Sequence, residues 1–209
     1  MTLGELKISS LMLICPSLEI NFDSDSGEGI EEKIMELKAN PNVIDYVSGI
    51  VFSINRAFSI IENRGLTKTK RVKLSFDVLE KTKDGYELDV SKIAPDVLYI
   101  ENVYQGENCR FRQEGDTLIF GNLKKEGLEI IYKEKLKRIK QSTSDLYEVP
   151  LDDCVLDLIP YFVKGELLLP EDPNEAEISR KHFLEMLTEL GQTEKKHNSD
   201  FVDTVYRIW

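Results

Sequence analysis

Residues 42–78 read NVIDYVSGIVFSINRAFSIIENRGLTKTKRVKLSFDV, and the spacing of the apolar residues changes within this stretch. Before Gly65 the apolar residues recur every three or four positions, as on one face of an α-helix. After residue 70 they alternate with polar residues, as in a strand with one buried face. The change predicts a mixed α+β chain, in which a long helix with Gly65 as its C′ residue leads into a small antiparallel β lobe.

Further helices are predicted before the long one. Thr2 and Glu5 have the spacing of a capping box, in which each side chain accepts a hydrogen bond from the other residue's backbone, so a helix should run from there to about Ile14. A short helix is expected over 30–39. We expect the long helix over 42–64 to be the central helix of the core, because its apolar face is continuous.

Helical patterns return after the lobe. The apolar run over 150–167 contains Pro160, which should kink the helix or split it. A last helix is expected over 173–190 and should end at Gly191. The predicted organisation therefore has four parts: N-terminal helices over 1–70, an antiparallel β lobe over 71–140, a C-terminal helix pair over 141–191 that packs on the N-terminal helices, and a docking tail over 192–209.

The β lobe is predicted from short alternating segments that turn residues separate. Asp84-Gly85 is a typical hairpin turn, and the alternating segments 72–78 and 86–90 on its two sides should pair with each other. These segments place a β-hairpin at the start of the lobe. Additional strands are expected at 97–104, 109–112, 117–120 and 128–132.

The composition of the 209 residues is that of a soluble, intracellular globular protein. Hydrophobic residues make up 41% of the chain and charged residues 31%. No stretch approaches the roughly 18 uninterrupted apolar residues of a membrane span, and we expect neither export nor membrane insertion. Cys15, Cys109 and Cys154 are odd in number and far apart in sequence, which favours reduced, packed thiols.

The charge of the chain argues against tight binding of nucleic acid. The formal net charge is −11, whereas affinity for DNA comes mainly from clustered Lys and Arg. The basic residues between Lys124 and Lys140 are a local exception. We interpret them as a solvated face of a strand or helix, with a contact for an acidic partner as the alternative.

No catalytic or metal-binding motif is evident. His182 and His197 are not spaced as metal ligands, and the sequence contains neither a glycine-rich phosphate loop nor a nucleophile elbow. A partial calcium-loop pattern at 23–34 lacks the Glu required at its last position. Asp152 and Asp153 suit the start of a helix. We therefore predict no enzyme activity, no metal and no cofactor, with an unmarked carboxylate site as the alternative.

The C-terminal half of the sequence resembles a known family. YEVPLDD at 147–153 and DLIPYFVKGELL at 157–168, followed by a helix with Ala176 and Phe183, resemble the head-to-tail adaptor proteins of tailed bacteriophages, also called connector or neck proteins. In organisation the chain is similar to the podovirus tail tubular proteins that sit beneath the portal. Two N-terminal stretches add to the resemblance, 1–7 and 54–57.

The resemblance implies a structural virion protein. It implies a closed ring of about twelve copies at the head-tail junction, between the portal protein and a downstream tail or neck protein. DNA would pass through the lumen without specific binding, and the chain would be made in the host cytoplasm, with no membrane contact. The alternatives are another tail-completion or baseplate component and a cellular adaptor that binds a protein partner.

Residues 201–209 contain the candidate partner-binding side chains. This stretch is rich in apolar residues, and apolar surface near a chain end is expected to be docked rather than exposed. The alternatives are docking on its own domain and docking on a neighbouring subunit or on the portal protein. The candidate residues are Phe201, Val202, Val205, Tyr206, Ile208 and Trp209.

Overall fold

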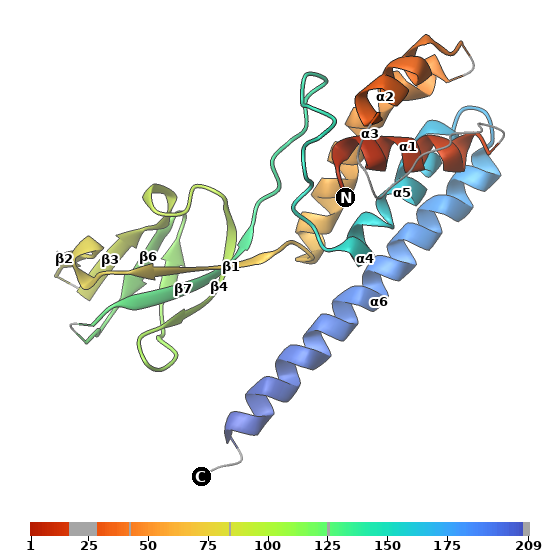
Figure 1. Cartoon of the computed structure of the whole chain (residues 1–209). Helices are drawn as coiled ribbons and strands as arrows, with labels where there is room; N and C mark the ends of the chain where they lie inside the picture. Colours follow the sequence, from red (N-terminus) through yellow and green to blue (C-terminus); the bar gives the residue numbers. More distant parts are fainter. Residues whose placement is uncertain (17–28, 42, 84, 125, 207–209) are drawn as a thin grey trace. The chain divides into compact units, whose positions relative to one another are not determined.

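The computed structural model describes residues 1–16, 29–41, 43–83, 85–124 and 126–206. They divide into a helical unit, Met1–Leu66 with Lys137–Trp209, and a β unit, Thr67–Leu136, which is inserted into it in sequence (Figure 1). The predicted α+β class, with a helical core and an inserted antiparallel lobe, is confirmed.

The described part of the helical unit contains helices from both ends of the chain. Three precede the β unit and three follow it. The predicted helices at the N-terminal end are confirmed within two residues at each boundary. The helices are α1 (Leu3–Ile14), α2 (Ile30–Ala39), α3 (Ile44–Arg64), α4 (Asp153–Leu156), α5 (Ile159–Leu167) and α6 (Pro173–Tyr206).

The core of the helical unit forms around α1. Eight of its twelve residues are buried, and α2, α3 and α5 all pack against it. Its buried apolar side chains include Leu3, Ile8 and Leu11, which point in different directions around the helix axis, and a helix that is apolar on several sides must be surrounded. The helix predicted over 42–64 shares this central place, because α3 packs against α1, α2, α5 and α6 through its buried face.

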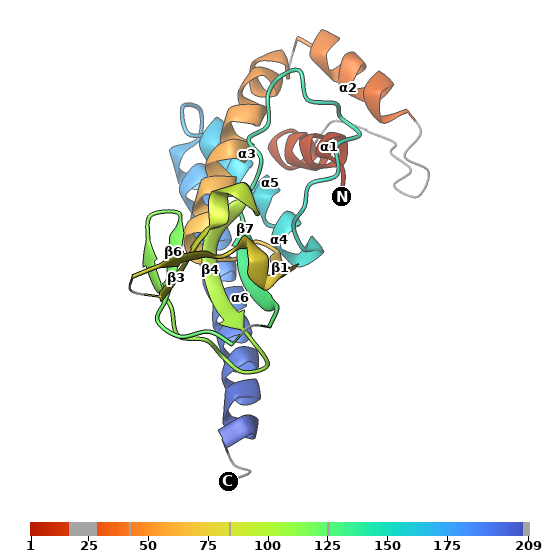
Figure 2. The same ribbon diagram turned by 90° about the vertical axis from the view of Figure 1, so that its left-hand side faces the viewer.

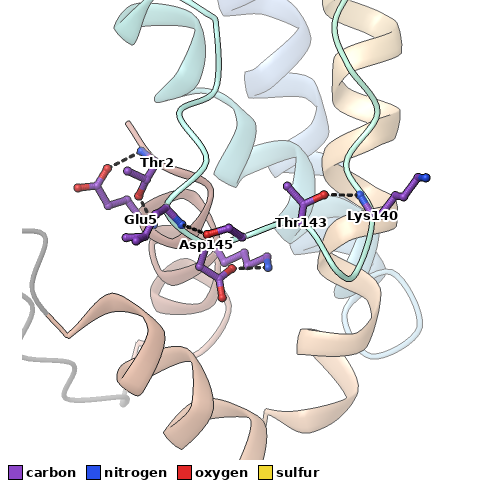
Figure 3. A network of polar contacts seen from close by, with 8 residues as sticks. Thr2, Glu5, Lys140, Thr143 and Asp145 are labelled. Carbon is purple, nitrogen blue, oxygen red and sulfur yellow. Dashed lines mark hydrogen bonds and ion pairs between the residues drawn. The ribbon is translucent and has the colours of Figure 1, made fainter.

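The start of α1 is held by the segment that precedes α4 (Figure 3). Thr2 and Glu5 form the predicted capping box: the Thr2 hydroxyl accepts from the Glu5 N–H at 3.2 Å, and the Glu5 carboxylate accepts from the Thr2 N–H at 2.6 Å. The Leu3 N–H donates to the Tyr147 carbonyl oxygen and the Gly4 N–H to the Asp145 carbonyl oxygen, each at 2.8 Å. Together these bonds satisfy donors that a helix start leaves without an internal partner.

α3 ends where its sequence predicts and is tied to the returning chain. Gly65 has a φ of 71°, a left-handed conformation that glycine adopts without steric cost. The Asn55 side chain donates to the Ile139 carbonyl at 2.8 Å and accepts from the Ile139 N–H at 2.9 Å. Asn55 therefore fixes the first residues after the β unit on the side of α3.

α3 is also the described helix whose length and composition would suit a membrane span. The core helices of soluble proteins meet the same criterion. Ile50, Ile54 and Phe58, which give α3 much of its apolar character, are each at most 1% exposed. The apolar face of α3 is therefore explained by its packing within the helical unit.

The C-terminal helices confirm the predicted effect of Pro160 and correct one predicted boundary. Pro160 splits the predicted run into α4 and α5 and lies in the first turn of α5, where a missing backbone N–H costs little. α6 begins at Pro173 as predicted but continues through Gly191 to Tyr206. The predicted helix end at Gly191 is therefore wrong, because a single glycine lowers helix stability by only about 1 kcal/mol and does not by itself break a long helix.

The β unit consists of two antiparallel sheets around one hydrophobic core. Their strand orders are β1-β7-β4 and β2-β3-β6-β5. Leu88 of one sheet and Val103 of the other belong to the same buried cluster. The strands are β1 (Thr69–Leu74), β2 (Glu80–Thr82), β3 (Gly85–Asp89), β4 (Val97–Tyr104), β5 (Arg112–Glu114), β6 (Thr117–Phe120) and β7 (Leu128–Glu134).

The first strand of the β unit is shorter than predicted. It ends at Leu74, and a single 3-10 turn over Phe76–Val78 follows, whose start is capped by the Ser75 hydroxyl. β1 pairs with β7, while the hairpin partner of β3 is β2. The predicted pairing of 72–78 with 86–90 is therefore wrong, although β2 and β3 do pair antiparallel with Thr82 opposite Gly85.

Candidate assembly surface

The segment that carries the family resemblance folds largely as a helical hairpin. α5 and α6 run antiparallel, with the ring centroids of Tyr161 and His182 4.6 Å apart and those of Phe162 and Phe183 5.0 Å apart. Phe183 is fully buried, and His182 is half-buried beside the tyrosine ring. The hairpin therefore has an aromatic contact on its inner side, and His182 has a packing role.

α5 and α6 approach each other closely at Gly165. A Cβ atom at this position would lie 2.8 Å from the Ala176 carbonyl oxygen and 2.3 Å from the Arg180 Cγ atom. Ala176 is itself fully buried. Two small residues thus permit a helix-helix distance that larger side chains would prevent. The contact also fixes the position of Glu166, the next residue along α5.

Glu166 is a buried carboxylate between two arginines. Its side chain is 8% exposed, whereas those of Arg56 and Arg180 are 50% and 36% exposed. One Glu166 oxygen accepts a hydrogen bond from Arg56 of α3. The other lies 2.9 Å from Arg180 Nη2, as an ion pair without hydrogen-bond geometry. Because one buried charge orients two exposed arginines, the group presents a net positive charge of one to solvent.

Two further polar contacts tie α3 to the hairpin. The Tyr46 hydroxyl donates to Glu171 at 2.6 Å, and Arg64 donates to the Thr188 hydroxyl at 3.2 Å. The hydrogen bond to Glu171, with burial as a smaller cause, raises the pKa of Tyr46 to about 12. Contacts near both ends of α3 place it parallel to α6 and alongside it.

Phe52 extends this surface along α3. Its side chain is 67% exposed, and the Arg56 guanidinium lies 5.9 Å from the centroid of its ring, within the range of a cation-π contact. Arg56 in turn pairs with Glu166. An exposed aromatic ring next to fixed arginines is the composition found in protein interfaces, in which aromatic residues and Arg are enriched.

A groove of about 930 Å³ runs along α6 on the side of Arg180. Leu169 and Leu184 supply apolar surface and are 46% and 39% exposed. Charged side chains of both signs flank them, with Arg180 and Lys181 among the cations and Glu185 among the anions. The volume lies at the upper end of the range of ligand pockets and is large enough for several bulky side chains.

α6 continues well beyond the groove. Its 34 residues correspond to a length of about 51 Å. In Figures 1 and 2 no other described helix of the helical unit lies beside its second half. Of the candidate partner-binding residues, Phe201, Val202, Val205 and Tyr206 are in its last turns, but their side chains are outside the described set, as are residues Ile208 and Trp209.

The groove was missed at the level of sequence. Ile178 is an apolar residue of α6 that is nevertheless 62% exposed. Leu184 follows Phe183 directly, so it lies about 100° around the helix from the buried stripe. An apolar residue in that position was the signal available for an exposed apolar surface.

The basic residues between Lys124 and Lys140 do not act as one group. Lys133 is 7% exposed, and its ammonium donates to a backbone carbonyl of the β unit at 3.0 Å. Arg138 donates to the buried carboxylate of Glu62 at 2.5 Å. The interpretation as a solvated face is wrong for Lys133, which is buried, whereas Arg138 is 43% exposed and pairs with Glu62 from the surface.

Among the described residues, no three His, Cys, Asp or Glu side chains gather as metal ligands. Asp152 is the N-cap residue of α4 and Asp153 lies in its first turn, where their charges favour the helix. The start of the calcium-like pattern, 23–28, is outside the described residues. All three cysteines are free thiols.

The sequence was compared with protein-family models and with curated proteins. Neither comparison finds a match. The likeness of 147–187 to the phage adaptor proteins therefore stays a resemblance.

Proposed function

We propose that this protein is a structural component of a tailed-bacteriophage virion and forms the head-to-tail adaptor ring between the portal protein and the tail. The resemblance over 147–187 carries the proposal. This stretch supplies the carbonyl of Tyr147 that holds the start of α1, and the α5–α6 hairpin that packs on α1 and α3. A ring subunit needs such a fixed helical unit, because each copy must present the same surfaces at the same angle to two neighbours.

The exposed surfaces of the helical unit support an assembly role. Ring closure needs two different surfaces on each copy, because a head-to-tail contact joins one surface to the other. The groove beside Leu184 and the second half of α6 are separate regions of the same unit. Each is the kind of surface that a neighbouring chain can cover.

The charge of the chain supports the passage of DNA. A lumen with a basic wall would bind the moving duplex through its phosphates. A subunit with a formal net charge of −11, repeated around a ring, instead repels the duplex. The charge therefore suits a conduit better than a DNA-binding ring.

Native mass spectrometry of the purified chain, alone and with the portal protein of the same phage, tests the proposal. We expect a closed species of one discrete copy number, about twelve, that binds the portal ring. A chain that stays monomeric at every concentration and does not bind the portal protein would contradict the proposal and favour a cellular adaptor.

A further inference from the structure

We propose that the groove beside α6 on one copy receives residues 201–209 of a neighbouring copy. The proposal rests on the ring assembly proposed above and names the surface that accepts the tail. It makes the tail and the groove the two halves of a head-to-tail contact.

The length of α6 excludes a contact of the tail with its own groove. Leu184 lines the groove, and α6 continues as a helix for 22 further residues to Tyr206, which corresponds to about 33 Å. Residues 207–209 can span at most about 11 Å when fully extended. Because α6 is continuous through Gly191, residues 201–209 cannot return to the groove of their own chain.

The chemistry of the tail matches that of the groove. By sequence the tail has six apolar residues, one acid, Asp203, and one base, Arg207. The groove offers apolar surface at Leu169 and Leu184, with cations and anions on its rim. Apolar side chains can therefore enter the centre of the groove while both tail charges find opposite charges at its edge.

The contact has the symmetry that a ring requires. Donor and acceptor are different regions of one chain, so a copy that gives its tail to one neighbour still has its own groove open for the next. Such a contact generates a closed ring when the rotation between copies divides a full turn. A rotation of 180° would close two copies by mutual exchange of tails, and a smaller rotation closes a larger ring.

The test uses the chain's only tryptophan, Trp209, as the reporter. A full-length variant carrying Val205→Glu and Trp209→Ala has a disabled tail, contains no tryptophan and keeps its groove. A synthetic peptide of residues 199–209 is titrated into it, and all tryptophan emission then comes from the peptide. We expect a saturable blue shift as Trp209 of the peptide leaves water.

A matched pair of substitutions on α6 assigns the binding site. Leu184→Glu places a charge in the groove, and Ile178→Glu places one at a position that does not line it. Both side chains are well exposed, at 39% and 62%, so both variants should fold as judged by circular dichroism. We expect Leu184→Glu to weaken peptide binding by about tenfold or more and Ile178→Glu to change it by less than about twofold.

The outcomes separate this inference from the proposed function. Absence of peptide binding, or equal weakening by both substitutions, overturns the assignment of the groove. A chain found in phage particles at the copy number of the portal protein would in that case still be an adaptor. Specific peptide binding by a chain that is absent from particles would instead support the groove and contradict the adaptor function.

Discussion

Lys7 and Asp145 form an ion pair inside the helical unit. Their charged atoms are 2.6 Å apart, and the two side chains are only 8% and 14% exposed. Asp145 also holds the start of α1 through its backbone carbonyl. A buried pair of this kind gives limited net stability, but removal of one partner leaves a charge without compensation in a region that excludes water.

Lys7→Ala is therefore expected to lower the free energy of unfolding of the helical unit by about 3–5 kcal/mol. Urea denaturation followed by far-ultraviolet circular dichroism measures the change. Lys181→Ala is the control, since the Lys181–Glu185 pair is 72% and 61% exposed and its loss should cost less than about 1 kcal/mol. Equal losses in the free energy of unfolding for the two substitutions would show that Lys7 is not effectively buried.

Tyr46 should lose its proton at a higher pH than an ordinary tyrosine. Its hydrogen bond to Glu171 favours the neutral phenol and raises its pKa to about 12, above the value of about 10 in an unfolded chain. The resulting stabilisation is fully present below pH 10 and is lost as the pH rises from 10 to 12. An ultraviolet titration of tyrosinate formation should show one tyrosine that ionises at a higher pH than an ordinary tyrosine, and Tyr46→Phe should remove this part of the titration curve. A profile that Tyr46→Phe leaves unchanged above pH 11 would contradict the assignment.

At the scale of elements, the α5–α6 hairpin depends on one glycine and tolerates another. A Cβ atom at Gly165 would overlap a backbone oxygen of α6, whereas a Cβ atom at Gly191 would meet no atom of the described chain within 4 Å. The same substitution should therefore act in opposite directions at the two sites. The first site tests packing between helices and the second tests helix propensity alone.

Gly165→Ala should destabilise the helical unit by about 1–3 kcal/mol because α5 must move away from α6. Gly191→Ala should stabilise it by up to about 1 kcal/mol, because alanine loses less backbone entropy in a helix. Thermal unfolding of both variants beside the unaltered chain measures the two shifts. A loss of stability in Gly191→Ala would contradict the continuous helix.

The sequence predicts an element well where a local signal decides it. The capping box at Thr2 and the glycine at the end of α3 are local, and both were predicted correctly. The end of β1 was missed because alternation continues through Phe76 and Val78 although Ser75 caps a turn there. The groove was missed because its apolar residues come from two places: Leu184 lies beside the buried stripe of α6, and Leu169 lies between α5 and α6, where no periodic pattern marks it.

At the scale of the whole molecule, assembly is expected to depend on the tail while folding does not. Deletion of 199–209 removes the last turns of α6, beside which Figures 1 and 2 show no other described helix of the helical unit. We expect folded chains that fail to form rings and particles that lack a stable head-tail junction. A chain with the residues of 201–209 in scrambled order controls for length and composition. Normal rings from the deleted chain would contradict a role of the tail in assembly.

A ring at the head-tail junction would hold a fixed number of copies in every particle, so the copy number of the chain in purified phage particles tests the proposed function. Quantitative mass spectrometry compares peptides of this chain with peptides of the portal protein from the same particles. The ring model predicts a copy number comparable to that of the portal protein, about twelve. Absence of the chain from particles would contradict the model.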